Sequence, residues 1–414
     1  MQGARRIFIG CVILARSVLA EGPLDRLGEK LTVSAMRDEF RARVSGTLDL
    51  EGYRLDQPSP GLIYTDGNTL FNPRLSLFVD AQWGANIYAF AHARLDRGFD
   101  PSDEGIELRL DEYAIRFSPP GNLINVQIGK FATVVGNWVP RHGSWNNAFV
   151  TAPLPYENLT GVWNFAAPRA GAQLLNWAHV GGNGNPADEY REKTLRTPII
   201  WGPSYARGIS VFGEVERFEY AIELKSASLS SHPDVWDQGE DHWRHPTVNG
   251  RLGYRPNEMW NFGFSLSSGA YLRASASGTL LPGHSLGDYR EIVLAQDASF
   301  AWHHWQVWAE AFEARFEIPG IDEARTFSYY VEAKYKITPQ LFAAIRWNQQ
   351  SFGTVPDAFG QPVHWGRAVW RADFAPTYRF TAHVELKLQY SLEHESNGPR
   401  AFGHLWAAQM VLRF

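Results

Sequence analysis

The chain has 414 residues, with 39 lysines and arginines against 44 aspartates and glutamates, and a formal net charge of −5. This length fits either two or three soluble domains or one large closed sheet. Aromatic residues make up 14% of the chain, although its mean hydropathy is −0.29. Such a composition is typical of a chain in which apolar and polar residues alternate, and its acidic balance argues against a nucleic-acid partner.

Residues 1–20 form a candidate secretory signal peptide. A basic start, with Arg5 and Arg6, precedes the apolar run 7–15 and an ending in small residues at Ala20. This order of features is typical of a cleaved signal. Its removal takes away the only cysteine, Cys11. The mature chain is therefore expected to contain neither disulfides nor thiolate metal sites.

From Phe40 onward, apolar and polar residues alternate, which is the period of a β-strand with two different faces. In the segment 379–393, Val384 and Leu386 point one way, while Glu385 and Lys387 point the other. The pair of strands at 160–167 and 170–180 is the weakest prediction, and without it the count falls from eighteen to sixteen. The predicted strands are 40–54, 71–83, 85–97, 106–118, 122–131, 160–167, 170–180, 205–216, 218–230, 246–256, 259–273, 289–302, 304–317, 324–336, 340–352, 365–375, 378–393 and 400–414.

Very short turns and long loops alternate between these strands. The connections at 119–121 and 338–339 are short, whereas those at 181–204 and 231–245 are long. Such alternation is typical of outer-membrane barrels. Because every backbone group must be paired in hydrocarbon, a sheet crosses a membrane only when it is closed.

The predicted fold class is therefore all-β: a transmembrane antiparallel up-and-down β-barrel of 16–18 strands, with 18 preferred. The barrel is expected to occupy residues 40–414 of an integral outer-membrane protein, after a short periplasmic segment at 21–39. Trp83, Trp260 and Trp302 fall near predicted strand ends. An aromatic girdle at the membrane interfaces has this placement.

Two stretches resemble the bacterial outer-membrane porin superfamily. The ending "AAQMVLRF", with Phe414 last, is similar to the family's C-terminal signature, and 108–131 resembles a hairpin of its phosphate-selective O/P group. The resemblance implies contact with outer-membrane lipid and lipopolysaccharide, and recognition of Phe414 by the barrel-assembly machinery. It also implies a homotrimer, although the residues leave a monomer open. The sequence "ATVVGNW" after Phe131 departs from the phosphate-selective pattern, which leaves phosphate selectivity open.

The stretch 136–161 follows the fifth predicted strand, where porins resembling this chain fold a loop into the lumen. Arg141, His142 and Trp145 lie there and would form a charged, ring-lined constriction. Charge and diameter of such a narrowing set pore selectivity. The alternative is an outside loop packed by its own aromatic residues.

A second candidate is a basic cluster that the alternation places on the lumen side. A three-residue turn at 376–378 would set Arg371 opposite His383, whereas a five-residue turn at 374–378 would set Arg367 opposite Glu385. Opposite charges in register are favourable, so the second, neutralised register is expected. The cluster comprises Arg346, Arg367, Arg371, Arg379, His383 and Lys387; other predicted lumen positions include Arg43, Arg74, Asp80, Arg94, Glu310 and Glu332.

The sequence contains no nucleophile elbow, no glycine-rich phosphate loop and no HExxH motif. We therefore expect no enzyme, no cofactor and no metal site. The favoured function is a water-filled channel for passive diffusion of small polar or charged solutes, with anions as one option. The alternative is a non-conducting outer-membrane barrel that serves as a surface binding or structural protein.

Overall fold

The computed structural model describes the chain apart from residues 1–22, 36–38, 98–104, 180–192, 238–241 and 399. The predicted signal peptide, 1–20, lies outside the described residues. Among those that are described, no helix is both long and apolar enough to cross a membrane.

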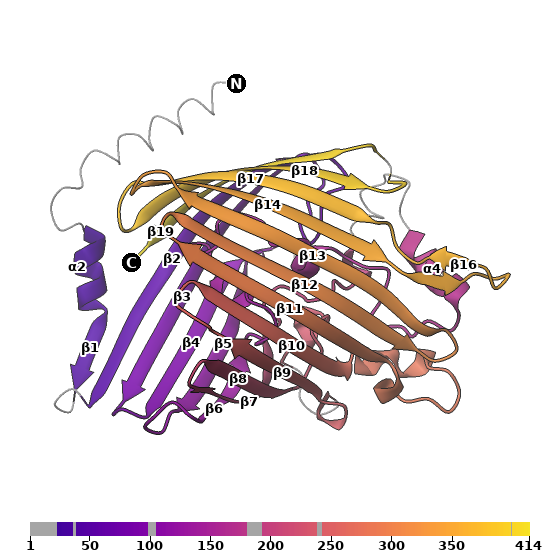
Figure 1. The fold of residues 1–414 in the computed structure, drawn as a ribbon, viewed down its shortest axis with the longest axis horizontal. Helices are drawn as coiled ribbons and strands as arrows, with labels where there is room; N and C mark the ends of the chain where they lie inside the picture. The colour runs from indigo at the N-terminus through magenta and orange to yellow at the C-terminus, as the bar shows by residue number, and fades with distance from the viewer. Residues whose placement is uncertain (1–22, 36–38, 98–104, 180–192, 238–241, 399) are drawn as a thin grey trace.

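The fold is a closed antiparallel barrel of sixteen strands (Figure 1), in which each strand pairs with its neighbours in sequence and β19 pairs with β2. The strands are β2 (Phe40–Leu55), β3 (Thr69–Trp83), β4 (Ile87–Asp96), β5 (Glu107–Phe117), β6 (Asn125–Phe131), β7 (Ala206–Val215), β8 (Phe218–Lys225), β9 (Thr247–Tyr254), β10 (Trp260–Ala270), β11 (Arg290–Trp302), β12 (Trp305–Ile318), β13 (Asp322–Lys336), β14 (Leu341–Phe352), β17 (Val369–Arg379), β18 (Val384–Glu395) and β19 (Gly403–Arg413). The predicted barrel class is thus confirmed.

Shorter elements lie in the connections and ahead of the barrel. They are α2 (Pro23–Lys30), β1 (Thr32–Ala35), α3 (Leu154–Glu157), α4 (Gly171–His179), β15 (Thr354–Pro356) and β16 (Pro362–His364), with the 3₁₀ helices η1 (Val139–Arg141), η2 (Pro233–Val235), η3 (His242–Arg244), η4 (Ala274–Thr279) and η5 (Leu286–Asp288).

The preference for eighteen strands is wrong, because the predicted pair 160–167 and 170–180 forms no barrel strand. This segment lies in the connection between β6 and β7, and its second half is the helix α4. The rings of Trp163 and Trp177 stack with centroids 4.2 Å apart. The apolar residues here therefore serve packing within a folded loop, and a short apolar run does not distinguish that role from a strand.

Both registers predicted for the last hairpins are also wrong. The predicted turns at 374–378 and 376–378 fall inside β17, which continues to Arg379. In the observed register Arg379 faces Glu385, and Arg371 faces Glu393. Opposite charges do pair, as expected, but with different partners.

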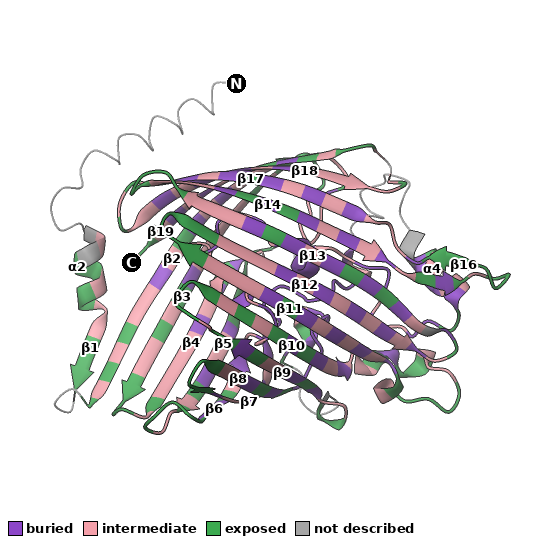
Figure 2. Ribbon diagram, viewed as in Figure 1, coloured by how far each residue is buried: buried purple, intermediate pink, exposed green. Residues whose placement is uncertain are grey.

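The strands carry apolar side chains outside the barrel and polar ones inside. On β8, Ile222 is 60% exposed, whereas its neighbours Glu223 and Lys225 are each 1% exposed. The same alternation of exposed and buried residues runs along most strands (Figure 2). A surface of this kind faces hydrocarbon rather than water.

On β12 the pattern inverts toward the long-loop end. The outward side chains change from Ala309 and Ala311 to Glu313 and Arg315, while Phe312 and Phe316 point inward and are fully buried. At this end the interior of the barrel is an apolar core, shared with the connection between β6 and β7. The prediction of a polar inner face is therefore wrong for this part of β12.

The seam of the barrel is completed by both ends of the described chain. β19 pairs with residues 47–55 of β2, and β1 pairs with residues 40–43 of the same edge. Between them, Phe414 and Gly46 exchange two backbone hydrogen bonds of 3.0 and 3.1 Å. A Cβ at Gly46 would lie 2.7 Å from the Phe414 ring and from the Ser76 carbonyl. A glycine is therefore required where this ring crosses the strand.

Candidate functional site

The connection between β6 and β7 enters the barrel, and its residues 132–179 are here called the inner loop. Val135, Tyr156 and Leu174 are 0% exposed and belong to a core shared with Phe312 and Tyr330 of the barrel wall. Polar side chains that point inward from β12 to β18 bind the inner loop at successive points along its length.

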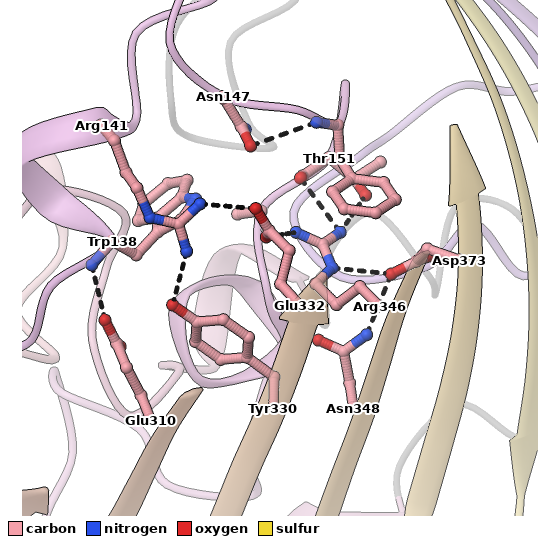
Figure 3. Close-up of polar contacts among 12 residues, drawn as sticks. Trp138, Arg141, Asn147, Thr151, Glu310, Tyr330, Glu332, Arg346, Asn348 and Asp373 are labelled. Atoms are coloured by element: carbon pink, nitrogen blue, oxygen red, sulfur yellow. Dashed lines mark hydrogen bonds and ion pairs between the residues drawn. The ribbon is translucent and has the colours of Figure 1, made fainter. Parts of the chain in front are cut away.

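Glu310 of β12 holds the start of the inner loop. Its carboxylate accepts hydrogen bonds of 2.5 Å from the backbone N–H groups of Asn137 and Trp138, and one of 2.5 Å from the Tyr156 hydroxyl. Figure 3 shows the carboxylate pointing at the Trp138 amide. Each donor would be unsatisfied without this acceptor, because the surroundings are buried.

Arg141 is fixed against β13. Its guanidinium contacts the Glu332 carboxylate at 2.7 Å and donates to the Tyr330 hydroxyl at 3.0 Å. It also lies 4.4 Å from the centre of the Trp308 ring. The sequence-predicted Arg141 is thus committed to the barrel wall (Figure 3).

Arg346 of β14 lies beneath the inner loop and its side chain is 0% exposed. It contacts Asp373 at 2.8 Å, donates to the Thr151 hydroxyl and carbonyl at 3.0 and 3.2 Å, and lies 4.2 Å from the Phe149 ring centre. Figure 3 shows this arginine pointing into the loop rather than into open space. Asn348 donates to the same Asp373 carboxylate at 2.9 Å.

Arg371 of β17 and Lys387 of β18, like Arg346, point inward and contact the inner loop. Arg371 pairs with Glu157 of the inner loop, donates to the Ala152 carbonyl at 2.5 Å and lies 3.2 Å from Asp373. Lys387 donates to the Ser144 carbonyl of the inner loop. These predicted pore-lining cations are buried and paired with carboxylates, and both contact the inner loop.

Trp145 of the inner loop packs against two arginines of the barrel. The guanidinium groups of Arg379 and Arg413 lie 4.6 and 3.9 Å from its ring centre. Arg379 also pairs with Glu385 at 3.0 Å, and His383 contacts the Arg413 carbonyl at 2.8 Å. This group lies at the short-turn end of the barrel, where Arg413 is the member that the sequence did not single out.

Two further predicted residues lie apart from that group. Arg367 contacts Glu395 at 3.4 Å in the long-loop region. His142 of the inner loop has both ring nitrogens engaged, at 2.5 Å from the Val139 carbonyl and 2.7 Å from the Tyr205 hydroxyl. Burial lowers the pKa of the His142 imidazole to about 4. The ring is therefore neutral at pH 7, with one nitrogen donating and the other accepting.

A cavity of about 800 Å³ separates the inner loop from the wall formed by β2, β3 and β4. Its lining begins at the short-turn end with His383 and Phe414 and reaches Leu62 and Tyr64 in the loop after β2. It therefore extends over the height of the barrel, between the inner loop and this wall, which are joined where the Ser144 hydroxyl donates to the Asp49 carboxylate of β2 at 2.8 Å. Three predicted site residues line it: His142, Trp145 and His383.

The wall formed by β2, β3 and β4 carries charges of both signs. Arg74 contacts Asp49 at 3.1 Å and also pairs with Glu51, while Arg94 contacts Asp111 at 3.2 Å. The alternation predicted that Arg74 and Arg94 point inward, as they do. Nothing in the local sequence indicates that the inner loop leaves this wall open.

Comparisons with known proteins give a likeness in structure alone. Neither a protein-family model nor a curated protein matches the sequence. The outer membrane channel DcaP of Acinetobacter baumannii superposes with a TM-score of 0.56 at 9% identity, covering 92% of this chain and 99% of that one. OmpF of Salmonella typhi, in a complex with daunomycin, gives 0.55 at 12% identity, covering 92% and 100%. The outer-membrane protein OmpT of Vibrio cholerae gives 0.52 at 8%, also covering 92% and 100%.

At these identities the likeness concerns the fold. The closed sixteen-stranded sheet, its apolar exterior and its charged interior define an integral outer-membrane β-barrel. More narrowly, the barrel shares its fold with OmpF, which superposes on 92% of this chain. The phosphate-selective subgroup stays a prediction from the hairpin at 108–131.

Proposed function

We propose that this barrel is a passive diffusion channel for small polar solutes and that solutes move along the cavity beside β2, β3 and β4. The observation that carries the proposal is the lining of that cavity, which includes residues from both rims of the barrel. A polar lining lets hydrated solutes pass, and the width left by the inner loop limits their size.

We further propose a preference for anions, based on how the cavity charges are paired. Glu51 is paired with Arg74, and Glu112 accepts a 2.9 Å hydrogen bond from the Ala132 amide. Among the described residues, no carboxylate lies within ion-pair distance of Arg43 or Arg413. Arg43 and Arg413 therefore leave basic charge open to a solute toward the short-turn end, and Arg97 adds an arginine to the lining at the long-loop end.

In this proposal the predicted site residues have two roles. Trp145, His142 and His383 belong to the wall of the path, and the guanidinium groups of Arg379 and Arg413 lie against the Trp145 ring. The remaining predicted cations Arg141, Arg346, Arg371 and Lys387 position the inner loop and do not face the solute. Arg367 has neither role.

The test is single-channel recording in planar bilayers, followed by reversal potentials in a salt gradient. Wild-type protein is expected to conduct and to prefer anions, and Arg43→Gln with Arg413→Gln is expected to shift the reversal potential toward cations. The matched control is Arg255→Gln, since Arg255 pairs with Glu219 in an exposed turn. A folded barrel that stays electrically silent would reject the channel and favour the non-conducting surface protein; conduction without any shift would reject the anion preference alone.

Three narrower expectations are proposals that come from the resemblance. Phosphate selectivity, suggested by 108–131, predicts that inorganic phosphate blocks the chloride current. A homotrimer is tested by chemical cross-linking of membranes that contain the protein. Recognition of Phe414 by the barrel-assembly machinery predicts that Phe414→Ala lowers the amount of barrel in the outer membrane. In that membrane the barrel is expected to contact lipid and lipopolysaccharide.

A further inference from the structure

A hollow of about 750 Å³ lies on the outside of the barrel over β9 to β13, and it is here called the outer trough. Its floor consists of short or thin side chains on β11 and β12, and its walls consist of larger ones on the flanking strands. The floor residues are Gln296, Ala298, Ala309 and Ala311; the wall residues include Phe262, Phe264, Phe327, Tyr329 and Val331.

The strand register explains why a hollow forms here. Ala298 pairs directly with Ala309, and the rows on either side of this pair carry Phe262 and Val331. Neighbouring strands lie about 4.8 Å apart, so the floor is narrow and follows β11 and β12. An extended hydrocarbon chain has this shape, and most of the surface that it would contact is apolar.

The height of the outer trough in the membrane follows from the next residues on β12. Glu313 and Arg315 point outward two and four positions beyond Ala311, which places Arg315 about 14 Å further along the strand. Charged side chains on a lipid-facing surface are costly within hydrocarbon. The row of Glu313 and Arg315 therefore lies at the level of lipid headgroups, with the outer trough below it in the acyl region.

Two arginines meet at that level. Arg315 of β12 and Arg325 of β13 are directly opposite each other on the outer face. Glu323 lies between them, with Arg325 in contact and Arg315 at 4.0 Å, and Glu313 lies 2.7 Å from Arg315. Glu317 is directly opposite Glu323 on the same face, so the row holds three carboxylates and two guanidinium groups. Like charges in register destabilise a strand pair, and a guanidinium offers five donors. The side chain of Arg325 is 55% exposed, so donors remain available to an anion from outside.

We propose that the outer trough holds one acyl chain of a lipid whose phosphate headgroup binds Arg315 and Arg325. Bidentate Arg–phosphate pairs are among the stronger hydrogen-bonded contacts in proteins, and the trough supplies apolar contact for the chain below. A second barrel fits less well, because two convex cylinders meet along a line and neither fills a hollow in the other. The inference depends on the membrane location of the barrel and not on conduction.

The experiment is native mass spectrometry of purified barrel with added phosphatidylglycerol, compared with a diacylglycerol of the same acyl chains. Wild type is expected to retain one phosphatidylglycerol at concentrations where the diacylglycerol is lost. Arg315→Gln with Arg325→Gln is expected to weaken retention roughly tenfold or more, and Ala309→Trp to weaken it by filling the floor. The control Ala408→Trp also changes a lipid-facing alanine, on β19, whose cross-strand neighbour Gly52 leaves room.

Equal retention by wild type, Ala309→Trp and the double arginine variant would overturn the proposal. So would an oligomer that dissociates on Ala309→Trp while bound lipid is unchanged, since the trough would then be a protein contact. Channel currents are recorded from the same samples. Loss of lipid with unchanged current supports the trough, whereas silent barrels that still bind lipid reject only the proposed function.

Discussion

Replacing Arg346 with methionine tests whether this residue anchors the inner loop or lines the proposed solute path. Arg346 contacts Asp373 and Thr151, and its side chain is fully buried. Methionine keeps similar bulk and removes the charge, so Asp373 keeps only Arg371, at 3.2 Å, as a charged partner. Breaking a buried ion pair typically costs about 3–5 kcal/mol. Because Arg371 still faces Asp373, we expect a loss near 3 kcal/mol in the free energy of unfolding.

The assay is denaturant unfolding of purified barrel in detergent, followed by tryptophan emission, with protease cleavage of the inner loop as a second readout. We expect lower stability, faster cleavage near Thr151 and noisier currents. The free energy of unfolding of Arg346→Lys is expected to lie between those of the wild type and Arg346→Met, since an ammonium retains the charge but not the planar guanidinium. If Arg346→Met unfolded like wild type and instead shifted the reversal potential as Arg43→Gln is expected to, Arg346 would line the path and the anchoring role would be wrong.

Three further predictions concern the loop, its protonation and the seam. Glu310→Ala is expected to free the start of the inner loop by leaving three donors unpaired, while Glu310→Gln keeps an acceptor and loses less; equal cleavage rates in both variants would contradict this. Because burial lowers the pKa of His142 to about 4, the unfolded chain, with a pKa near 6.5, binds the proton first. Stability is thus complete above about pH 6.5 and lost as pH falls toward 4, by about 2 kcal/mol at pH 5; His142→Gln should flatten this dependence, and an unchanged slope in unfolding measurements would refute it. Gly46→Val is expected to lower the yield of barrel refolded in detergent, where no assembly machinery acts, because its side chain would overlap Phe414 and the Ser76 carbonyl. Phe414→Ala in the same chain is expected to restore only part of that yield, since the overlap with Ser76 remains; no defect in Gly46→Val would show that the seam tolerates a side chain.

The strands were predictable because a wall between lipid and water imposes a period of two on every strand. The period does not report where a strand ends when the alternation continues through a turn, and β17 was placed too early for that reason. It also does not separate a strand from an apolar run packed inside the barrel, as Trp163 and Trp177 illustrate.

The site was predictable as a list of inward residues but not as an arrangement. Arg141 and Glu332 are 191 positions apart in sequence, and Arg371 and Glu157 are 214 apart. Such contacts depend on the path of the inner loop across the lumen, which local patterns do not encode. For this reason Arg346 and Arg371 were expected beside the solute and lie beneath the loop instead.

The cavity lies to one side of the barrel, so the strands that line it differ from most of those that hold the inner loop. Strands β12 to β18 supply many of the side chains that bind the inner loop, whereas β2, β3 and β4 line the cavity and contact the loop through Asp49 and Ser144. Arg74 on β3 pairs with the buried carboxylates Asp49 and Glu51, and Asp49 also accepts a 2.8 Å hydrogen bond from Ser144 of the inner loop. A substitution at Arg74 is therefore expected to change both the charge of the cavity wall and the stability of the barrel, because it leaves buried carboxylates without this partner.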